Sequence, residues 1–143
     1  MRPLAPSLPA LDDVGAPRIV LRDGSVASVR PATGADVDAL RQFFRDLSPE
    51  ARYRRFLSAG DPPDAVITRL SDSTNPAQGL TLIVHRSVAG NIRVIAAASY
   101  FALSADTAEA AFAVADQFQG KGLGTALLER LAVAAAGMGF RRF

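Results

Sequence analysis

Residues 110–131 read AAFAVADQFQGKGLGTALLERL, and this stretch decides the fold. Its first six residues form a continuous apolar run of strand length, which is typical of a strand that is covered on both faces. Three glycines at alternate positions follow, and an amphipathic segment comes after them. The stretch therefore predicts a central strand, a glycine-rich loop and a helix, in that order.

The predicted helix has apolar residues at three- and four-residue spacing, which would form one buried stripe. These residues are Leu127, Leu128, Leu131 and Ala135. Gly137 stands where a glycine commonly follows the end of a helix, so we expect the helix to end there.

The loop between strand and helix has the properties of a phosphate site. Glycines lack the Cβ atoms that would block a ligand, and they allow positive φ, so that successive N–H groups can converge on one point. The following helix adds unpaired N–H groups and the positive end of its dipole. We expect a pyrophosphate as the ligand. The alternative is a tight connection whose glycines only ease packing.

The spacing of the glycines excludes two common phosphate motifs. The dinucleotide fingerprint G-x-G-x-x-G is absent, and no Gly-Lys pair is followed by Ser or Thr as in a Walker A loop. What remains is Gln119-x-x-Gly122-x-Gly124, which resembles the coenzyme A pyrophosphate loop of the GNAT superfamily of N-acetyltransferases.

Three earlier segments of the sequence resemble one particular group within this superfamily. Residues 22–25 (RDGS), 29–32 (VRPA) and 47–56 (LSPEARYRRF) together resemble the opening of GNAT domains from bacterial protein-lysine acetyltransferases of the Pat type. In those proteins the domain is fused to an acyl-CoA synthetase-like region. The likeness covers residues 19–143. It implies an enzyme that uses acetyl-CoA to acetylate a protein lysine, with an acyl-CoA synthetase as the expected acceptor.

The resemblance also implies roles for individual residues. The cofactor-binding residues would be Ala113, Val114, Gln119, Gly120, Lys121, Gly122, Leu123, Gly124 and Thr125. A backbone N–H near Val114 would stabilise the oxyanion. The alternative for Lys121 is a solvent-facing side chain. The acid that protonates the leaving group lies, in the family, beyond the last residue of this chain.

Glu109 stands at the position of the family's catalytic glutamate. A lysine amine, with an unperturbed pKa near 10.4, must lose a proton before it attacks a thioester, so a general base is useful. The alternative is an ordinary solvated glutamate in the connection formed by residues 106–109. We assign no role to His85, and we expect Tyr100 to be a packing residue.

The composition limits the number of domains and the kinds of ligand that we expect. A chain of 143 residues that is 49% hydrophobic predicts one domain. The net charge is only +2 and Lys121 is the sole lysine, which argues against nucleic-acid binding. There is no cysteine and only one histidine, so no metal is expected.

The first 17 residues contain four prolines and lack the apolar core of a secretory signal. We expect residues 1–17 to be a flexible tail and residues 18–143 to be the GNAT-like domain. No apolar run is long enough to span a membrane, and we expect a cytoplasmic protein.

Further patterns complete the fold prediction. Asp23-Gly24 between apolar runs predicts a hairpin of strands 19–21 and 26–29, and Gly90-Asn91 predicts a second hairpin of strands 80–85 and 92–101. Helices are expected after the cap residue Thr33, from Pro49 to residue 56 or 57, and from 64 to 70. The class is α+β, with a mixed, mostly antiparallel sheet that is flanked by helices.

Residues 139–143 begin what resembles a further strand, whereas the GNAT pattern continues with another helix and two more strands. The domain is therefore expected to be truncated before its last strands. An open sheet edge invites pairing with another chain, so we expect a homodimer or strand exchange.

Two other functions remain open on the sequence. The acceptor could be a small amine, an antibiotic or an amino acid instead of a protein. The domain could also be a non-catalytic module that senses acyl-CoA and regulates an attached domain. A simple interaction domain would apply only if no acyl-CoA binds.

Overall fold

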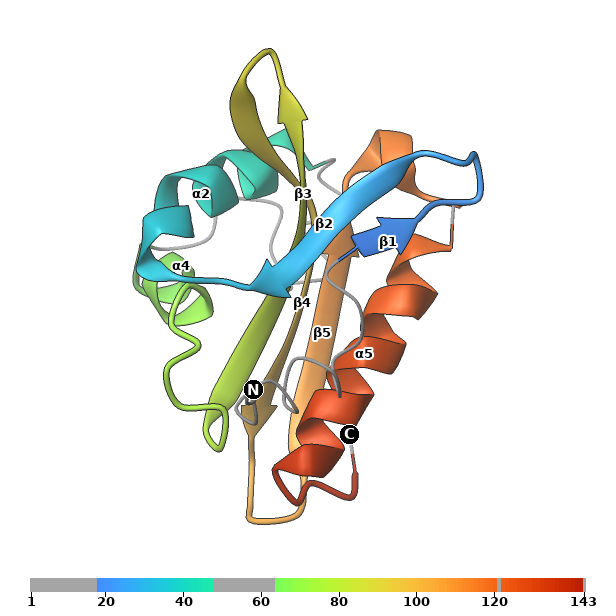
Figure 1. Cartoon of the computed structure of the whole chain (residues 1–143). Helices are drawn as coiled ribbons and strands as arrows, with labels where there is room; N and C mark the ends of the chain where they lie inside the picture. Colours follow the sequence, from blue (N-terminus) through green and yellow to red (C-terminus); the bar gives the residue numbers. More distant parts are fainter. Residues whose placement is uncertain (1–17, 48–63, 121, 143) are drawn as a thin grey trace, which may run out of the picture.

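The computed structural model describes residues 18–47, 64–120 and 122–142 (Figure 1). A five-stranded antiparallel sheet has the strand order β1-β2-β3-β4-β5. Its strands are β1 (Arg18–Val20), β2 (Val26–Pro31), β3 (Gly79–Val88), β4 (Asn91–Ala102) and β5 (Ala108–Val114). The predicted α+β class is confirmed. The helix expected from Pro49 onward lies outside the described residues.

Helices cover both faces of the sheet. The short 3-10 helix η1 (Gly34–Asp36) leads into α2 (Val37–Asp46), which packs on one face together with α4 (Asp64–Leu70). The 3-10 helix η2 (Asp116–Phe118) follows β5, and α5 (Leu123–Gly137) covers the opposite face (Figure 1). Two hydrophobic cores result, one on each side of the sheet.

Strand β4, which lies between β3 and β5, contributes to both cores because its side chains alternate between the two faces. Tyr100 and Ala98 point into the core beneath α5, and Ala97 points into the core beneath α2. A register shift between Val84 and His85 interrupts this alternation. The small alanines of β4 let the layers approach closely from both sides.

Both predicted hairpins are confirmed, and the second is displaced by one residue. Gly24 has a φ of +88° in the first turn. The second turn uses Ala89 and Gly90, with φ of +52° and +84°, instead of Gly90 and Asn91. Positive φ at both central residues is the geometry that matches the twist of a two-residue hairpin. The two flanking strands are consequently longer than predicted.

An ion pair fixes the passage from β2 to α2. The Asp36 carboxylate accepts hydrogen bonds from Arg30 Nη2 at 2.7 Å and Arg30 Nη1 at 2.8 Å. Thr33 and Asp36 also form a capping box, as expected for a cap at Thr33. The Arg30 guanidinium holds the pKa of Asp36 at about 2, below its ordinary value of 3.8.

The end of α5 differs from the prediction. Gly137 is the last helical residue, and Gly139 is the glycine that adopts the left-handed conformation, with a φ of +92°. Gly139 N–H donates to Ala136 O and Phe140 N–H donates to Ala135 O, which together make a Schellman motif. This ending places the buried Phe140 ring 5.4 Å from that of Tyr100.

The chain then reaches the free edge of β5. Thr107 pairs in parallel with Arg142, and Ala108 N–H donates to Arg142 O at 2.9 Å. The further strand expected from residue 139 onward thus begins beside β5. Along the rest of its length β5 pairs only with β4 among the described residues, so its predicted central position is not seen there.

Within the described ranges, no helix is long and apolar enough to cross a membrane.

Candidate functional site

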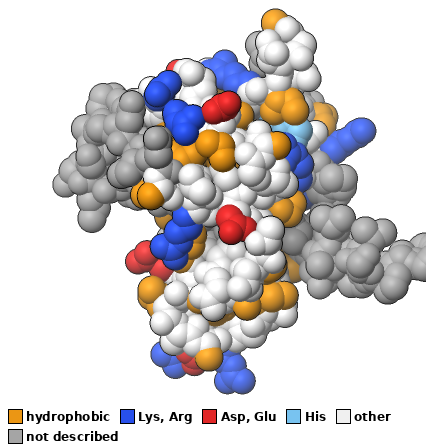
Figure 2. Space-filling model, turned by 90° about the vertical axis from the view of Figure 1, so that its left-hand side faces the viewer, with side chains coloured by type: hydrophobic (Ala, Val, Ile, Leu, Met, Phe, Trp, Pro, Cys, Tyr) orange, Lys and Arg blue, Asp and Glu red, His pale blue; other side chains and the backbone are white. Residues whose placement is uncertain are grey.

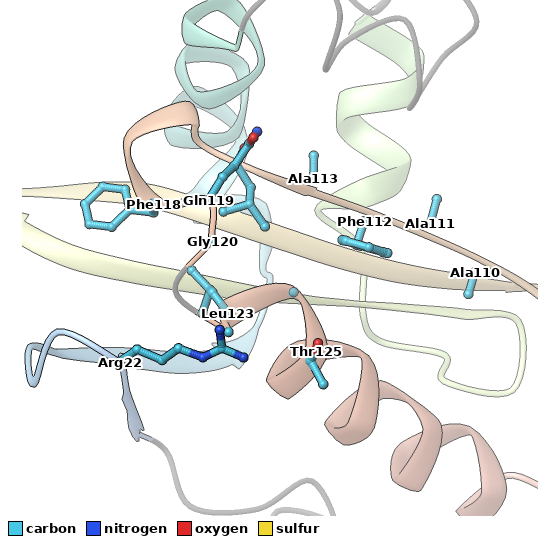
Figure 3. A pocket seen from close by; sticks show the side chains of 13 residues that line it. Arg22, Ala110, Ala111, Phe112, Ala113, Phe118, Gln119, Gly120, Leu123 and Thr125 are labelled. Carbon is cyan, nitrogen blue, oxygen red and sulfur yellow. The ribbon is translucent and has the colours of Figure 1, made fainter.

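A cavity of about 660 Å³ lies where the free edge of β5 meets the beginning of α5 (Figure 3). It is lined by Arg22, residues 110–114, Phe118, Gln119, Gly120 and residues 122–125. The strand, the loop and the helix that the sequence predicted as consecutive elements therefore converge on one cavity.

The hydrogen-bonding phase of β5 decides which of its peptide groups face this cavity. Ala115 N–H donates to Ile95 O on β4, and Ala108 N–H donates to Arg142 O on the other side. Because peptide groups alternate along an antiparallel strand, those of Ala110, Phe112 and Val114 face the free edge. Apart from Val114 O, which accepts from Gln119 Nε2, these groups have no partner among the described residues and can pair with an extended ligand.

Ala113 lines the cavity in a different way from Val114. It lies two residues before Ala115, whose N–H donates to β4, so its own peptide groups also face β4, and its small side chain is buried in the core beneath α2. The Val114 N–H, in contrast, points to the free edge.

Gln119 connects the loop to the end of β5. Its Nε2 donates to Val114 O at 3.1 Å, and its own N–H donates to Asp116 O at 3.3 Å. The side chain is thus engaged with the protein, and it fixes where the loop leaves the strand.

The glycines of the loop prepare the beginning of α5. Gly120 and Gly122 have φ of +77° and +82°, and Gly122 is the N-cap residue. The amides of Leu123, Gly124 and Thr125 lie in the first helical turn, where no partner exists within the helix. No other described residue accepts a hydrogen bond from them. These amides and the positive end of the helix dipole suit an anion.

Two of the glycines also lie close to neighbouring side chains. A Cβ atom at Gly124 would lie 3.0 Å from the Phe112 ring, and one at Gly122 would lie 3.0 Å from Arg22 Nε. A Cβ atom at Gly120 would meet nothing within 4 Å. The conformation of the loop and the lack of side chains together keep this end of the cavity open.

Glu109 is the second residue of β5 and lies opposite Phe101 in the adjacent strand. It is therefore part of the strand and not of the connection before it. The side chain is exposed and lies on the same face as Ala111 and Ala113. Glu109 does not line the cavity itself, but it directly precedes the lining residue Ala110.

Two other ionisable residues lie away from this site. Tyr100 donates from its hydroxyl to Pro76 O at 2.7 Å, and burial raises its pKa to about 12. Burial, followed by the charge of Arg30, lowers the pKa of His85. No group of three His, Asp or Glu side chains gathers as a metal site in the part of the chain that the structure describes.

Sequence reasoning missed two residues that shape the cavity. Phe112 is 47% exposed although it belongs to an apolar run, and its ring forms one wall. Arg22 comes from the turn between β1 and β2, one hundred positions before Gly122. Its sequence context signals only a hairpin, so only the folded chain reveals its place.

The face that α2 and α4 cover carries no continuous basic patch among its described residues. Figure 2 shows arginine, acidic and apolar side chains interspersed over this face.

Comparison with known proteins identifies relatives of the chain. The acetyltransferase (GNAT) family matches residues 38–143. Acetyltransferase PA5475 of Pseudomonas aeruginosa is 31% identical over 125 residues, which are 85% of this chain and 66% of that protein. Acetyltransferase Pat of Mycolicibacterium smegmatis is 30% identical over 125 residues, which are 87% of this chain and 37% of that protein. The chain spans less than two thirds of either relative.

Two solved structures of acyltransferases are also similar to this chain. The GNAT domain of S. lividans PAT superposes with a TM-score of 0.76 at 32% identity, covering 87% of this chain and 73% of that one. A cAMP-binding acyltransferase from Mycobacterium smegmatis matches with a TM-score of 0.55 at 30% identity, covering 86% of this chain and 35% of that one.

Proposed function

Because this chain belongs to the GNAT family of acetyltransferases, we propose that it transfers the acetyl group of acetyl-CoA to a lysine ε-amine of a protein. The proposed acceptor is an acyl-CoA synthetase. One observation carries the proposal: the unpaired edge of β5 leads directly to the unpaired amides of residues 122–125 within one cavity. The similarity to a Pat protein and to the GNAT domain of a PAT supports an enzyme of the Pat type, and the acceptor is the one that the resemblance to this type implies.

The cavity offers hydrogen-bond partners to two parts of coenzyme A, the diphosphate and the pantetheine chain. The amides of residues 122–125 would hold the diphosphate, since they lie at the positive end of the helix dipole and no described residue accepts from them. The peptide groups of Ala110 and Phe112 and the N–H of Val114 would bind the amides of the pantetheine chain as an added strand would. When bound, acetyl-CoA supplies an acyl carbon that is activated as a thioester.

Glu109 is proposed to be the general base. Its carboxylate is exposed at the far end of β5 from the glycine loop, so an incoming amine can reach it. It would remove the proton from the amine, directly or through a water molecule. The small, partly buried side chain of Ala111 on the same face of β5 leaves room for the acceptor.

The free edge also supplies the donor for the developing negative charge on the acyl oxygen. The N–H groups of Phe112 and Val114 both face this edge, and the Phe112 N–H is the closer of the two to Glu109, at about 10 Å along the strand. We therefore move the expected oxyanion donor from Val114 to the Phe112 N–H and assign a pantetheine carbonyl to the Val114 N–H.

The experiment is an acetyl-transfer assay that follows release of the free thiol. The acceptors are a bacterial acyl-CoA synthetase, free lysine and a panel of small amines, and mass spectrometry then identifies the acetylated residue. We expect acetylation of a synthetase lysine. Turnover with small amines alone would contradict the protein acceptor. Binding of acetyl-CoA without turnover on any acceptor would instead support a sensing module.

The role of Glu109 is tested in the same assay. Glu109→Gln should lower kcat about 100-fold and leave the Kd for CoA unchanged. Glu129→Gln, which changes an exposed glutamate on α5, is the matched control and should behave as the unmodified chain. If Glu109→Gln turns over normally with a competent acceptor, the base is another group.

A further inference from the structure

We infer that Arg22 binds the diphosphate of coenzyme A together with the amides of the first turn of α5. This inference rests on the proposed acetyl-CoA site. It makes the turn between β1 and β2 a part of the coenzyme site, although nothing in the glycine motif includes it.

The first argument is the position of the guanidinium group. A Cβ atom built on Gly122 would lie 3.0 Å from Arg22 Nε and 3.6 Å from both Cζ and Nη2. The absent side chain of Gly122 therefore makes room for the arginine, and Figure 3 shows the guanidinium reaching toward the beginning of α5. The guanidinium and the amides of the first helical turn border the same cavity.

The second argument is the charge balance at this place. No carboxylate pairs with Arg22 among the described residues. The neighbouring Asp23 accepts hydrogen bonds from the Ser25 N–H at 2.9 Å and from Ser25 Oγ at 2.6 Å. The first turn of α5 contains no acidic residue. A cation and a positive helix end thus border one cavity without an anion from the described chain.

The third argument is that the turn is held in place. Leu21 N–H donates to Ser25 O at 2.8 Å, and Leu21 is buried in the same core as Leu123 and Leu127 of α5. Arg130 Nη2 donates to Arg18 O at 3.1 Å and joins β1 to the same helix. Arg22 is therefore carried on a scaffold that is fixed to the helix whose beginning it faces.

These three observations indicate an anionic ligand. The guanidinium is planar and presents two parallel N–H donors, which match the oxygens of a phosphate or a carboxylate. A diphosphate is large enough to contact the helix amides and the arginine together. Its two phosphate groups would supply the negative charge that the site lacks.

The test is isothermal titration of CoA and of dephospho-CoA, which lacks the 3′-phosphate, into four forms of the chain: unmodified, Arg22→Ala, Arg22→Lys and Arg18→Ala. Arg18 is an exposed arginine of β1 outside the cavity, so Arg18→Ala controls for net charge. Arg22→Ala should weaken both ligands about tenfold. Arg22→Lys should give a smaller loss, because it keeps the charge and loses the planar fork.

The outcomes separate this inference from the proposed function. If the unmodified chain binds no CoA, the proposed function fails and the inference fails with it. If CoA binds and Arg22→Ala matches Arg18→Ala, only the inference is wrong. A loss for CoA without a loss for dephospho-CoA would move Arg22 to the 3′-phosphate and overturn its assignment to the diphosphate. Thermal melting without ligand verifies that each variant is folded.

Discussion

The Gln119 side chain donates a hydrogen bond to the Val114 carbonyl over 3.1 Å, which ties the glycine loop to the last residue of β5. The carbonyl faces the free edge of the strand, where no other described residue pairs with it. Gln119 therefore positions the loop, and the amides after it are the groups that remain for a ligand.

This relationship predicts the effect of Gln119→Ala. The change leaves the Val114 carbonyl without its partner and frees the loop, and a hydrogen bond of this kind contributes about 1 kcal/mol. We expect the Kd for CoA to rise about fivefold, as measured by titration calorimetry. Gln117→Ala, two residues earlier on the exposed side of η2, is the control. Equal behaviour of the two variants would show that the bond does not position the loop.

The close approach of Gly124 to Phe112 predicts coupling between these residues. Gly124→Ala brings a methyl group against the Phe112 ring, so the ring must move within the cavity. We expect weaker CoA binding and little or no gain in stability. In a Phe112→Ala background the same change should stabilise the chain by up to about 1 kcal/mol, because alanine favours the helix.

A double-mutant cycle measures this coupling from urea unfolding and CoA titration. If Gly124→Ala has the same effect in the unmodified chain and in the Phe112→Ala variant, the Phe112 ring is not the reason for a glycine at position 124.

The ion pair of Arg30 and Asp36 predicts a pH-dependent contribution to stability. The pKa of Asp36 is lowered to about 2, so its contribution is fully present above about pH 4 and is lost as the pH falls from about 4 to 2. Because the Arg30 side chain is 35% exposed, we expect Asp36→Asn to cost about 2 kcal/mol at pH 7. The cost should shrink markedly at pH 2.5.

Urea unfolding at the two pH values tests this expectation. The control is Asp38→Asn, since the Asp38 side chain in the ion pair with Arg41 is 97% exposed. A loss from Asp36→Asn that does not vary with pH would contradict an origin in the charge of Asp36.

Replacement of Tyr100 should lower the stability of the chain without changing catalysis. Tyr100→Phe removes the hydrogen bond to Pro76 O and should lower the free energy of unfolding by about 1 kcal/mol. The rate of acetyl transfer should stay the same, because this buried hydroxyl lies outside the cavity. A large loss of turnover in a variant of normal stability would instead make Tyr100 a participant in proton transfer.

Local patterns were enough to predict most of the fold. The apolar run of β5, the glycines and the spacing in α5 are short-range signals, and each element formed in the expected order. The Asp23-Gly24 turn was equally clear, because positive φ is required there and glycine supplies it.

Features that depend on long-range packing were missed. The sequence offers glycines at both 137 and 139 as the end of α5, and only the burial of Phe140 against Tyr100 decides for the second. The strand β5 begins early enough to include Glu109 because residues 101 and 102 of β4 pair with it. Arg22 meets Gly122 through tertiary structure alone.

The central claim is that the amides of residues 122–125 hold the diphosphate of coenzyme A. The most direct measurement is a titration of the ¹⁵N-labelled chain with CoA, followed through its assigned amide resonances. We predict that the largest shifts fall on Gly122, Leu123, Gly124 and Thr125, while the amide of Leu40 in α2 stays in place. Failure of CoA to bind, or shifts confined to residues away from the beginning of α5, would contradict the claim.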